Sequence, residues 1–181
     1  GERGMFNRKA ADEQVAKNGR RQTGHMWGTN PCSEIILRPY QFCNLSEVVV
    51  RETDDLLSLR SKVRIATMLG TFQSTLTDLK YLRKIWKTNT EEERLLGVSL
   101  TGIMDHLVLA RNVDSKIWLQ EMKQVAIDTN KEYADKIGIP RSTAITCVKP
   151  SGTVSQLTDS ASGIHARHNP FYIRTVRGDN K

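Results

Sequence analysis

The chain has 181 residues, of which 38% are hydrophobic and 26% are charged, and its formal net charge at pH 7 is +7. That length suits one domain, and no apolar run approaches the roughly 20 residues that a membrane-spanning helix needs. Three cysteines are too few for a secreted disulfide scaffold, so the composition indicates a protein of the reducing cytoplasm. The positive charge would suit phosphate groups or nucleic acid, but it is also typical of an ordinary solvated surface.

The first predicted elements are short. Residues 1–28 are polar and rich in Gly, Asn, Arg and Lys, so we expect a surface or linker segment with a short helix at 10–17. Apolar runs at 35–37 and 48–50 predict two short strands.

Two long helices are predicted further along. Between residues 56 and 82 apolar side chains recur three and four positions apart, which indicates a helix with one buried face. A second helix is predicted at about 116–137, where Gly138 and Pro140 supply the stop signals. The predicted buried faces consist of Ile65, Met68, Leu69, Phe72, Leu76 and Leu79 in the first helix and of Trp118, Met122, Val125, Thr129 and Tyr133 in the second.

Further strands are predicted between and after these helices. They cover residues 95–100, 144–148 and 172–176, and a helical stretch at 103–110 follows the first of them. Strands that alternate with long helices are typical of an α/β fold whose parallel strands are buried on both faces.

Three polar side chains near the start of the chain could carry chemistry. Asn30, Cys32 and Glu34 stand two residues apart, so an extended backbone would turn all three to one side. A carboxylate can take a proton from a hydroxyl, an amide can orient that hydroxyl, and a thiol can act as nucleophile, metal ligand or hydrogen-atom donor. Taken alone, however, the triplet favours a plainer interpretation, in which Cys32 is a small core residue and Glu34 a surface charge.

The other cysteines and the histidines do not predict a metal site. Cys43 comes eleven residues after Cys32, which is too far for a Cys-x-x-Cys redox pair, and two cysteines are too few for a zinc site. No histidine stands at a spacing that pairs it with a cysteine; the four are His25, His106, His165 and His168.

A hydroxyl-rich turn follows the strand predicted at 144–148. Free backbone N–H groups at a helix start, hydroxyl groups and a glycine can together bind an anion, and Lys149 would add positive charge. Simple capping of the helix by Ser151 or Thr153 would explain the same pattern equally well. The candidate anion-binding residues are Pro150, Ser151, Gly152, Thr153, Val154 and Ser155.

Five short stretches carry the strongest signal in the sequence. They are GTNPCSEI at 28–35, FCNL at 42–45, LGVSLTG at 96–102, VKPSGTV at 148–154 and SGIH at 162–165. In this order and spacing they closely resemble the ribonucleotide reductase family, above all its monomeric, adenosylcobalamin-dependent ribonucleoside-triphosphate reductases. Any one match could be chance, but five in register span nearly the whole chain.

This resemblance implies a radical-based reduction of ribonucleotides to 2′-deoxyribonucleotides for DNA synthesis, with adenosylcobalamin as the cofactor. Cys32 would become the thiyl radical that takes the 3′ hydrogen of the ribose, Glu34 would be the base for the 3′ hydroxyl, and Asn30 would hydrogen-bond the sugar. Cys43 would be one of two cysteines that supply reducing equivalents and end as a disulfide. The turn at 150–155 would bind the substrate phosphates.

Two expectations about the cysteines follow from those roles. Hydrogen-atom abstraction needs a neutral thiol shielded from water, so we expect Cys32 to be buried. Cys147 matches no catalytic cysteine of the family, and its place in an apolar strand predicts a packing role.

The resemblance also implies the fold and the partners. Residues 1–181 would form an incomplete catalytic domain, a segment of the family's ten-stranded α/β barrel with the radical cysteine on an inward loop. The family's upstream redox cysteine and C-terminal cysteine pair have no counterpart here, so we expect the chain to be inactive alone. Its expected partners are the ribonucleotide, the remaining segments of the same reductase and a thioredoxin-type reductant, without membrane or direct nucleic-acid contact.

Departures from the family pattern leave alternatives open. Arg3 stands where Pro is usual and Ser33 where Gly is usual, which affects the expected loop geometry. An iron-dependent class I ribonucleoside-diphosphate reductase large subunit would use the same site residues, although a bulky apolar residue is more common there at the position of Pro31. A basic nucleic-acid-binding domain would explain the charge, but aromatic residues are few. An inactive fragment would keep the motifs without the reaction.

Overall fold

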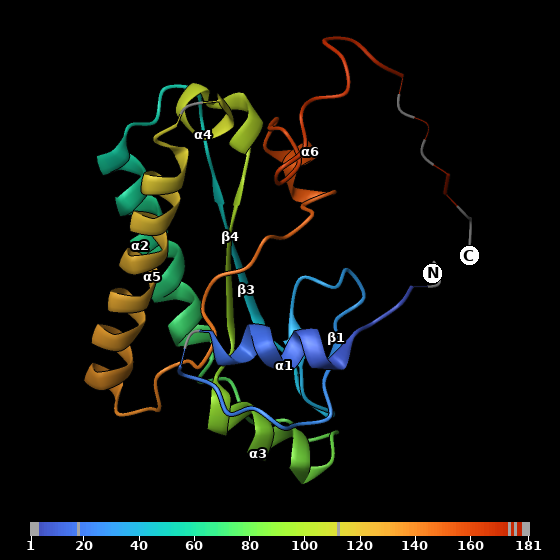
Figure 1. The fold of residues 1–181 in the computed structure, drawn as a ribbon, viewed down its shortest axis with the longest axis vertical. Helices are drawn as coiled ribbons and strands as arrows, with labels where there is room; N and C mark the ends of the chain where they lie inside the picture. The colour runs from blue at the N-terminus through green and yellow to red at the C-terminus, as the bar shows by residue number, and fades with distance from the viewer. Residues whose placement is uncertain (1–3, 18, 112, 174, 176, 179–181) are drawn as a thin grey trace.

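A parallel pair of strands forms the centre of the fold (Figure 1). The computed structural model describes residues 4–17, 19–111, 113–173, 175, 177 and 178. Strand β3 (Asn44–Val49) pairs in parallel with β4 (Leu96–Thr101), and Asn44 lies opposite Leu96. On the other side of β4, Val98 forms a parallel bridge with Thr146. Among the described residues no strand pairs with the remaining edge of β3.

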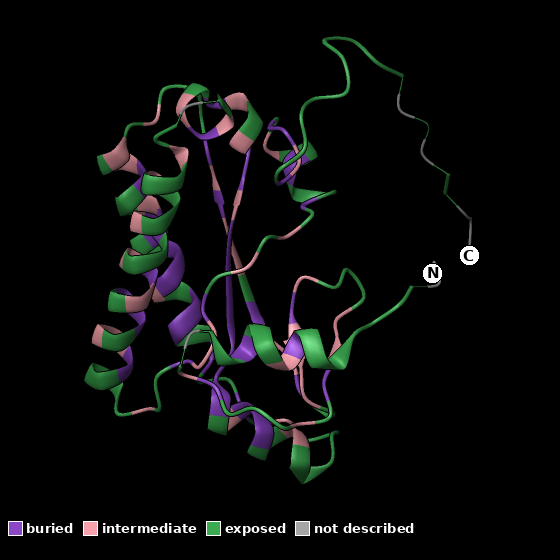
Figure 2. Cartoon of the chain, in the orientation of Figure 1, coloured by how far each residue is buried: buried purple, intermediate pink, exposed green. Residues whose placement is uncertain are grey.

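Two long helices cover one face of this strand pair. Helices α2 (Leu56–Gln73) and α5 (Ser115–Ile137) pack against each other and against the strands, and Figure 2 shows buried residues on their inner sides. A capping box between Asp55 and Ser58 starts α2, and Gly138, with a φ of 71°, ends α5 in the left-handed conformation. The apolar core between helices and strands includes Val48, Val50, Leu59, Val63, Leu96, Val98, Met122 and Ala126.

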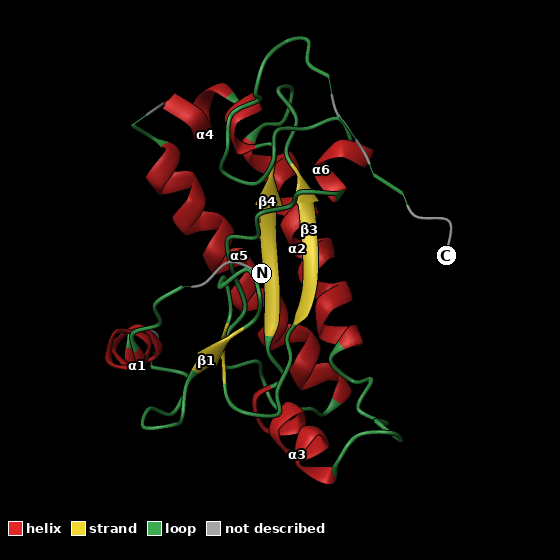
Figure 3. Cartoon of the chain, turned by 90° about the vertical axis from the view of Figure 1, so that its right-hand side faces the viewer, coloured by secondary structure: helices red, strands yellow, loops and turns green. Residues whose placement is uncertain are grey.

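The opposite side of the strands carries the shorter elements. The antiparallel hairpin of β1 (Gly28–Thr29) and β2 (Ile36–Leu37), helix α1 (Arg8–Ala16) and helix α6 (Val154–Leu157) lie there (Figure 1). In Figure 3, β3 and β4 run side by side with α2 behind them. The remaining elements are α3 (Lys84–Glu93), which precedes β4, and the 3₁₀ turn η1 (Ile103–Asp105) and α4 (Leu107–Arg111), which follow it.

Several predicted elements are confirmed. Helix α1, strands β2 and β4, helix α5 and the helical stretch after β4 lie where the sequence predicts them, and β3 begins earlier than predicted. The mixed α/β character is therefore confirmed. The helices, however, cover one face of the strand pair, and the other face carries the hairpin. No helix in the part of the chain that the structure describes is both long and apolar enough to cross a bilayer.

The expectation that residues 1–28 form a surface or linker segment is wrong in part. Trp27 is 2% exposed and packs with Ala11, Val15 and Ile36 in a second small core. Its indole Nε1–H donates to Asp12 at 2.7 Å. A polar composition concealed this cluster because a single tryptophan supplies most of its apolar surface.

The predicted buried face of the first long helix is also wrong. Ile65, Leu69, Phe72 and Leu76 are between 41% and 71% exposed, Met68 and Leu79 are half-buried, and Leu79 lies beyond the end of α2. The face that packs inward carries smaller residues, among them Ala66, Thr67, Gly70 and Thr71. Small side chains let the helix approach closely: a Cβ on Gly70 would lie 3.5 Å from Leu96.

Two predicted strands are not formed as expected. The segment at 144–148 pairs through the single bridge of Thr146. In the segment at 172–176, Tyr172, Ile173 and Thr175 are in no strand, while Arg174 and Val176 lie outside the described residues. Among the described residues no strand pairs with the outer edge of 144–148, and an isolated strand edge pairs weakly. Tyr172 instead donates its hydroxyl to Gln156 Oε1 at 2.8 Å.

Candidate active site

The loop that joins β1 to β2 carries the Asn30, Cys32 and Glu34 triplet. The backbone N–H of Asn30 donates to the carbonyl of Ile35 at 3.3 Å, and the Asn30 Oδ1 accepts from the Ile35 N–H at 3.0 Å. Inside this closure the Ser33 N–H donates to the Asn30 carbonyl, and Ser33 has a φ of 63°. The segment is thus a tight turn, and the expectation of an extended backbone with three side chains on one side is wrong.

Cys32 is exposed, which contradicts the expectation that its thiol is buried. The physical reason is its place at the tip of the turn, where Pro31, Cys32 and Ser33 are all exposed and no segment of the described chain covers them. Glu34, two residues later, has the opposite environment, because its side chain is only 3% exposed. The loop therefore presents the thiol outward and places the carboxylate inward.

The Glu34 carboxylate is held on one side and free on the other. Its Oε1 pairs with the Nζ of Lys149 at 3.2 Å, whereas its Oε2 is buried and has no hydrogen-bond partner among the described residues. Burial by itself raises the pKa of Glu34, but the neighbouring Asn30 amide and the Lys149 ammonium outweigh it, so the pKa lies below its ordinary value. Glu34 is therefore an ionised carboxylate with one unused acceptor oxygen.

Lys149 interacts electrostatically with several groups of the site. Burial lowers its pKa, but Glu34, Cys32 and Glu47 act in the other direction, so the pKa of Lys149 is raised. Glu47, from β3, has a buried Oε1 without a hydrogen-bond partner among the described residues. Sequence reasoning missed Glu47, although in an extended segment its position four residues after Cys43 would place both side chains on one face.

Two further thiols lie on the sheet face below the loop. The Sγ atoms of Cys43 and Cys147 would be 3.2 and 3.1 Å from a Cβ placed on Gly97, so both approach the same point on β4. Burial raises the pKa of Cys147 to about 12 and that of Cys43 still further, and the Cys147 thiol itself disfavours ionisation of Cys43. Both side chains are therefore neutral thiols, and Cys147 packs beside a candidate redox cysteine.

The turn at 150–155 is built around two buried serines. Ser151 is 3% exposed and has a φ of 53°, and its Oγ is buried without a partner among the described residues. Thr153 occupies the N-cap of α6 but makes no side-chain cap hydrogen bond. Simple capping by Ser151 or Thr153 therefore does not explain the turn. The buried serine pair is completed by Ser155, and the exposed members are Pro150, Gly152, Thr153 and Val154.

The stretch at 162–165 hydrogen-bonds both to this turn and to β4. Ser162 Oγ donates to the Ser151 carbonyl at 3.0 Å, and Gly163 donates its N–H to Thr101 Oγ1 at 2.9 Å. Gly163 has a φ of 55°, and a Cβ on it would lie 2.6 Å from the Lys149 carbonyl oxygen. A glycine is needed here because both the backbone conformation and the close approach exclude a side chain.

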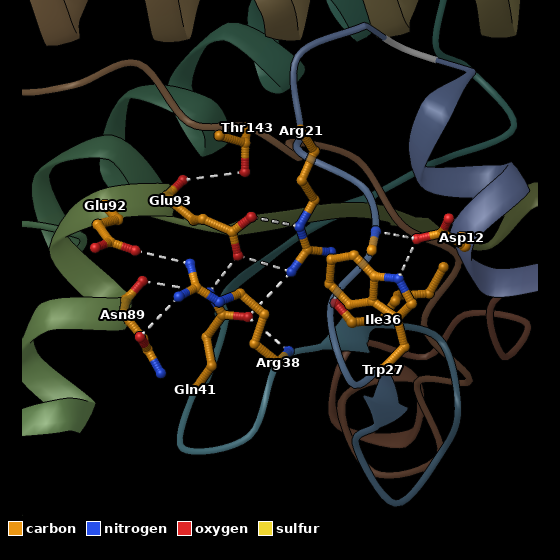
Figure 4. Close-up of polar contacts among 11 residues, drawn as sticks. Asp12, Arg21, Trp27, Ile36, Arg38, Gln41, Asn89, Glu92, Glu93 and Thr143 are labelled. Atoms are coloured by element: carbon orange, nitrogen blue, oxygen red, sulfur yellow. Dashed lines mark hydrogen bonds and ion pairs between the residues drawn. The ribbon is translucent and has the colours of Figure 1, made fainter. Parts of the chain in front are cut away.

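A buried ion pair anchors the hairpin, as Figure 4 shows. Arg21 donates to both oxygens of Glu93, at 2.7 and 2.8 Å, and to the Ile36 carbonyl at 2.7 Å. Its guanidinium also lies 4.6 Å from the centre of the Trp27 ring. Burial raises the pKa of Glu93, but hydrogen bonds from Arg21 and Gln41 outweigh it and the pKa is lowered.

A second set of contacts extends this network to α3. Gln41 hydrogen-bonds Glu93 and the Asn89 carbonyl, and its Oε1 accepts from the Arg38 backbone N–H. The Arg38 side chain in turn donates to Glu92 and Asn89 (Figure 4). Sequence reasoning missed this network because its members lie far apart in the chain and form no motif. It fixes the base of the hairpin whose loop carries Cys32.

The described residues offer no ready-made metal site. They contain no group of three or more His, Cys, Asp or Glu side chains placed to hold an ion.

Comparison with known sequences identifies similar proteins. No family model matches the chain. The adenosylcobalamin-dependent ribonucleoside-triphosphate reductase of Lacticaseibacillus paracasei is 27% identical over 93% of this chain. A probable enzyme of the same name from Dictyostelium discoideum is 27% identical over 96% of it. The matched regions are 25% and 22% of those proteins, so the chain spans about a quarter of the length of the curated relatives it matches.

A solved structure has a similar fold. The crystal structure of a B-12 dependent (class II) ribonucleotide reductase matches 76% of this chain and 22% of that protein, with a TM-score of 0.63 and 24% identity. At this identity the likeness concerns the fold. The resemblance to adenosylcobalamin-dependent ribonucleoside-triphosphate reductases inferred from the sequence is confirmed by these relatives, and the solved structure agrees with it in fold.

Proposed function

We propose that this chain is a catalytic segment of a cytoplasmic, adenosylcobalamin-dependent ribonucleotide reductase that reduces ribonucleoside triphosphates to deoxyribonucleotides. One observation carries the proposal. Glu34 is a buried carboxylate with a free oxygen, and it pairs with Lys149, the residue that precedes the hydroxyl-rich turn. The motifs at 28–35 and 148–154, far apart in sequence, thus contribute to one site.

The proposed roles follow from the surroundings of each side chain. Cys32 takes the 3′ hydrogen atom of the ribose, and the free Oε2 of Glu34 accepts the proton of the 3′ hydroxyl. Asn30 closes the loop through its Oδ1 and keeps its amide nitrogen for Glu34 and the sugar. The buried, unpartnered Oγ of Ser151 and the backbone of the turn at 150–155 bind the substrate phosphates.

Cys43 supplies part of the reducing equivalents. Replacement of the 2′ hydroxyl by hydrogen releases water and consumes two hydrogen atoms, which leave two thiols and convert them to a disulfide. The neutral, buried state of Cys43 suits this role because the thiol keeps its hydrogen. Its disulfide partner comes from a segment of the reductase outside this chain, and a thioredoxin-type reductant restores both thiols.

Adenosylcobalamin fits this chain through one feature. When bound, it supplies the chemistry that removes the hydrogen atom from a thiol. The exposed Cys32 at the tip of its turn is the group that the described chain offers to such a partner.

The same proposal assigns residues 1–181 to the catalytic barrel domain. The free edge of β3 and the exposed apolar residues of α2 are surfaces that neighbouring strands and helices of a ten-stranded barrel would cover. The exposure of Cys32 is consistent with this arrangement, since a loop that points into a barrel is shielded by the rest of the barrel wall.

The decisive experiment uses the complete reductase that contains this segment. Cys32→Ser is expected to abolish deoxynucleotide formation, because an alcohol O–H bond is too strong to replace the thiol. Cys147→Ser, a matched change at a thiol with a proposed packing role, is expected to keep turnover. Nucleotide reduction that survives Cys32→Ser would overturn the proposal, and activity that depends on iron instead of added adenosylcobalamin would assign the chain to the class I enzymes.

A further inference from the structure

We propose that Lys149 is a positioning residue for this reaction: its ammonium group holds Oε1 of Glu34 and thereby directs the free Oε2 toward the substrate hydroxyl. The inference rests on the proposed function and adds a residue to it. Lys149 would also connect phosphate binding to proton transfer, because the turn at 150–155 begins directly after it.

The backbone of Lys149 is fixed on both sides. Its N–H donates to the Oγ of Ser99, on β4, at 2.9 Å. Its carbonyl oxygen lies against Gly163, where a Cβ would approach to 2.6 Å. A side chain that starts from a fixed backbone has fewer positions to sample, so its ammonium group can hold a partner in a defined place.

The contact between the two side chains is well shielded from solvent. The side chains of Glu34 and Lys149 are 3% and 30% exposed, and their charged atoms are 3.2 Å apart. A charge interaction in such a place is stronger than at an open surface. Because Oε1 is engaged and Oε2 is not, the pair leaves one defined acceptor position. The groups that interact electrostatically with the two residues are Asn30 and Cys32 of the loop, Cys43 directly before β3, Glu47 of β3, and Cys147 directly after Thr146.

Loss of Lys149 would make the protonated form of Glu34 easier to reach. Burial disfavours a carboxylate, and the hydrogen bonds from the Asn30 side chain and the Glu34 backbone would then oppose this effect without the ammonium charge. Glu34 would then bind a proton more readily and could not accept one from the substrate. The ammonium group therefore favours the ionised form of Glu34 as well as orienting the carboxylate.

The test measures Glu34 directly. The carboxyl carbon of Glu34 is titrated by NMR in the 181-residue chain, with Glu34→Gln used to assign the signal and circular dichroism to check folding. Lys149→Met is expected to shift the Glu34 midpoint upward by about one pH unit or more, the effect of losing an adjacent opposite charge. In Lys149→Arg, which keeps the charge, the Glu34 midpoint should stay close to that of the parent chain.

Two controls make the result specific. Glu47→Gln removes a charge of the same sign as Glu34, opposite to that of Lys149, and should not raise the Glu34 midpoint. If Lys149→Met does not fold, Lys149→Gln provides the same loss of charge with a polar side chain. An unchanged Glu34 midpoint in folded Lys149→Met or Lys149→Gln would overturn the inference.

The complete reductase separates this inference from the proposed function. There, Lys149→Met should move the acidic limb of the pH profile for nucleotide reduction upward, with Lys149→Arg close to the parent. Lack of turnover in the parent enzyme would contradict the proposed function and leave the titration result standing. An unmoved titration in an active enzyme would contradict only the role of Lys149.

Discussion

Arg21 and Glu93 meet where almost no solvent reaches them, since their side chains are 4% and 6% exposed. The Arg21 guanidinium also binds the Ile36 carbonyl and Gln41, so its donors are matched on several sides. A buried charge that loses its partner is costly, because it is neither solvated nor paired. This pair therefore holds the hairpin to the end of α3 and so fixes the position of the hairpin whose loop carries Cys32.

Arg21→Met should destabilise the chain strongly. Loss of one partner from a buried pair costs about 3–5 kcal/mol, and a fit of urea unfolding curves would measure it. Arg141→Met is the matched control, since it removes a solvent-screened, exposed pair with Asp135 and should change stability little. Equal losses in the two variants would contradict a stabilising role for the buried pair.

The pH dependence of the stability difference between the parent chain and Arg21→Met gives a second readout. The folded pKa of Glu93 lies below its ordinary value of 4.5, so its contribution to stability is present above that value and is lost as pH falls through the folded pKa. The difference in unfolding free energy between the parent and Arg21→Met should therefore shrink in acid. A difference that stays constant from neutral pH down to the acid transition would mean that the ion pair is not its source.

At the scale of elements, Gly163 packs closely against Lys149 and Pro150, at the start of the turn at 150–155. Gly163→Ala combines a positive φ of 55° with a Cβ that would lie 2.6 Å from a backbone oxygen. We expect a loss of about 1–3 kcal/mol, because neither strain nor overlap can relax without moving the backbone. Gly152→Ala, in the same turn, places its Cβ in open space and should change stability little. Thermal unfolding of both variants tests the difference, and similar melting temperatures would contradict it.

The elements that the sequence predicts correctly are those whose signals are local. Strand β4 is a mostly apolar run that contains Leu96, Val98 and Leu100, and α5 ends at a glycine in the left-handed conformation. Helix α3 has no such signal, because its buried residues are Asn89, Thr90 and Glu93. The buried face of α2 was misplaced for a related reason, since small residues pack there and the large apolar ones face outward.

The site shows the same division between local and distant information. The spacing of Asn30, Cys32 and Glu34 is readable, but the tight turn that separates their directions depends on hydrogen bonds across the loop. The pairing of Glu34 with Lys149 joins residues 115 positions apart, and no periodicity in the sequence predicts such a contact. Family motifs identify which residues matter, whereas their mutual orientation requires the fold.

For the whole molecule, the exposed side of α2 and the free edge of β3 form one continuous surface. A groove of about 350 Å³ runs between them and is lined in part by Val48, Ile65 and Leu69. Phe72 and Leu76 extend the apolar surface along and beyond the helix. Exposed apolar surface of this kind, next to unpaired strand hydrogen-bond groups, is typical of an interface. We assign it to contacts with the remaining segments of the proposed reductase.

The double substitution Ile65→Lys with Leu69→Lys tests this assignment. Both side chains are more than half exposed, so each change should cost the isolated chain no more than about 0.5 kcal/mol, measured by urea unfolding. Self-association, measured by light scattering after size exclusion, should fall, and so should the recovery of nucleotide reduction when the chain is combined with its missing segments. Leu107→Lys, at a residue 71% exposed on α4, controls for added charge alone. It should change neither self-association nor the recovery of nucleotide reduction. Val63→Lys, inside the core, should unfold the chain. Undiminished assembly of the double variant would mean that this surface faces solvent in the complete enzyme.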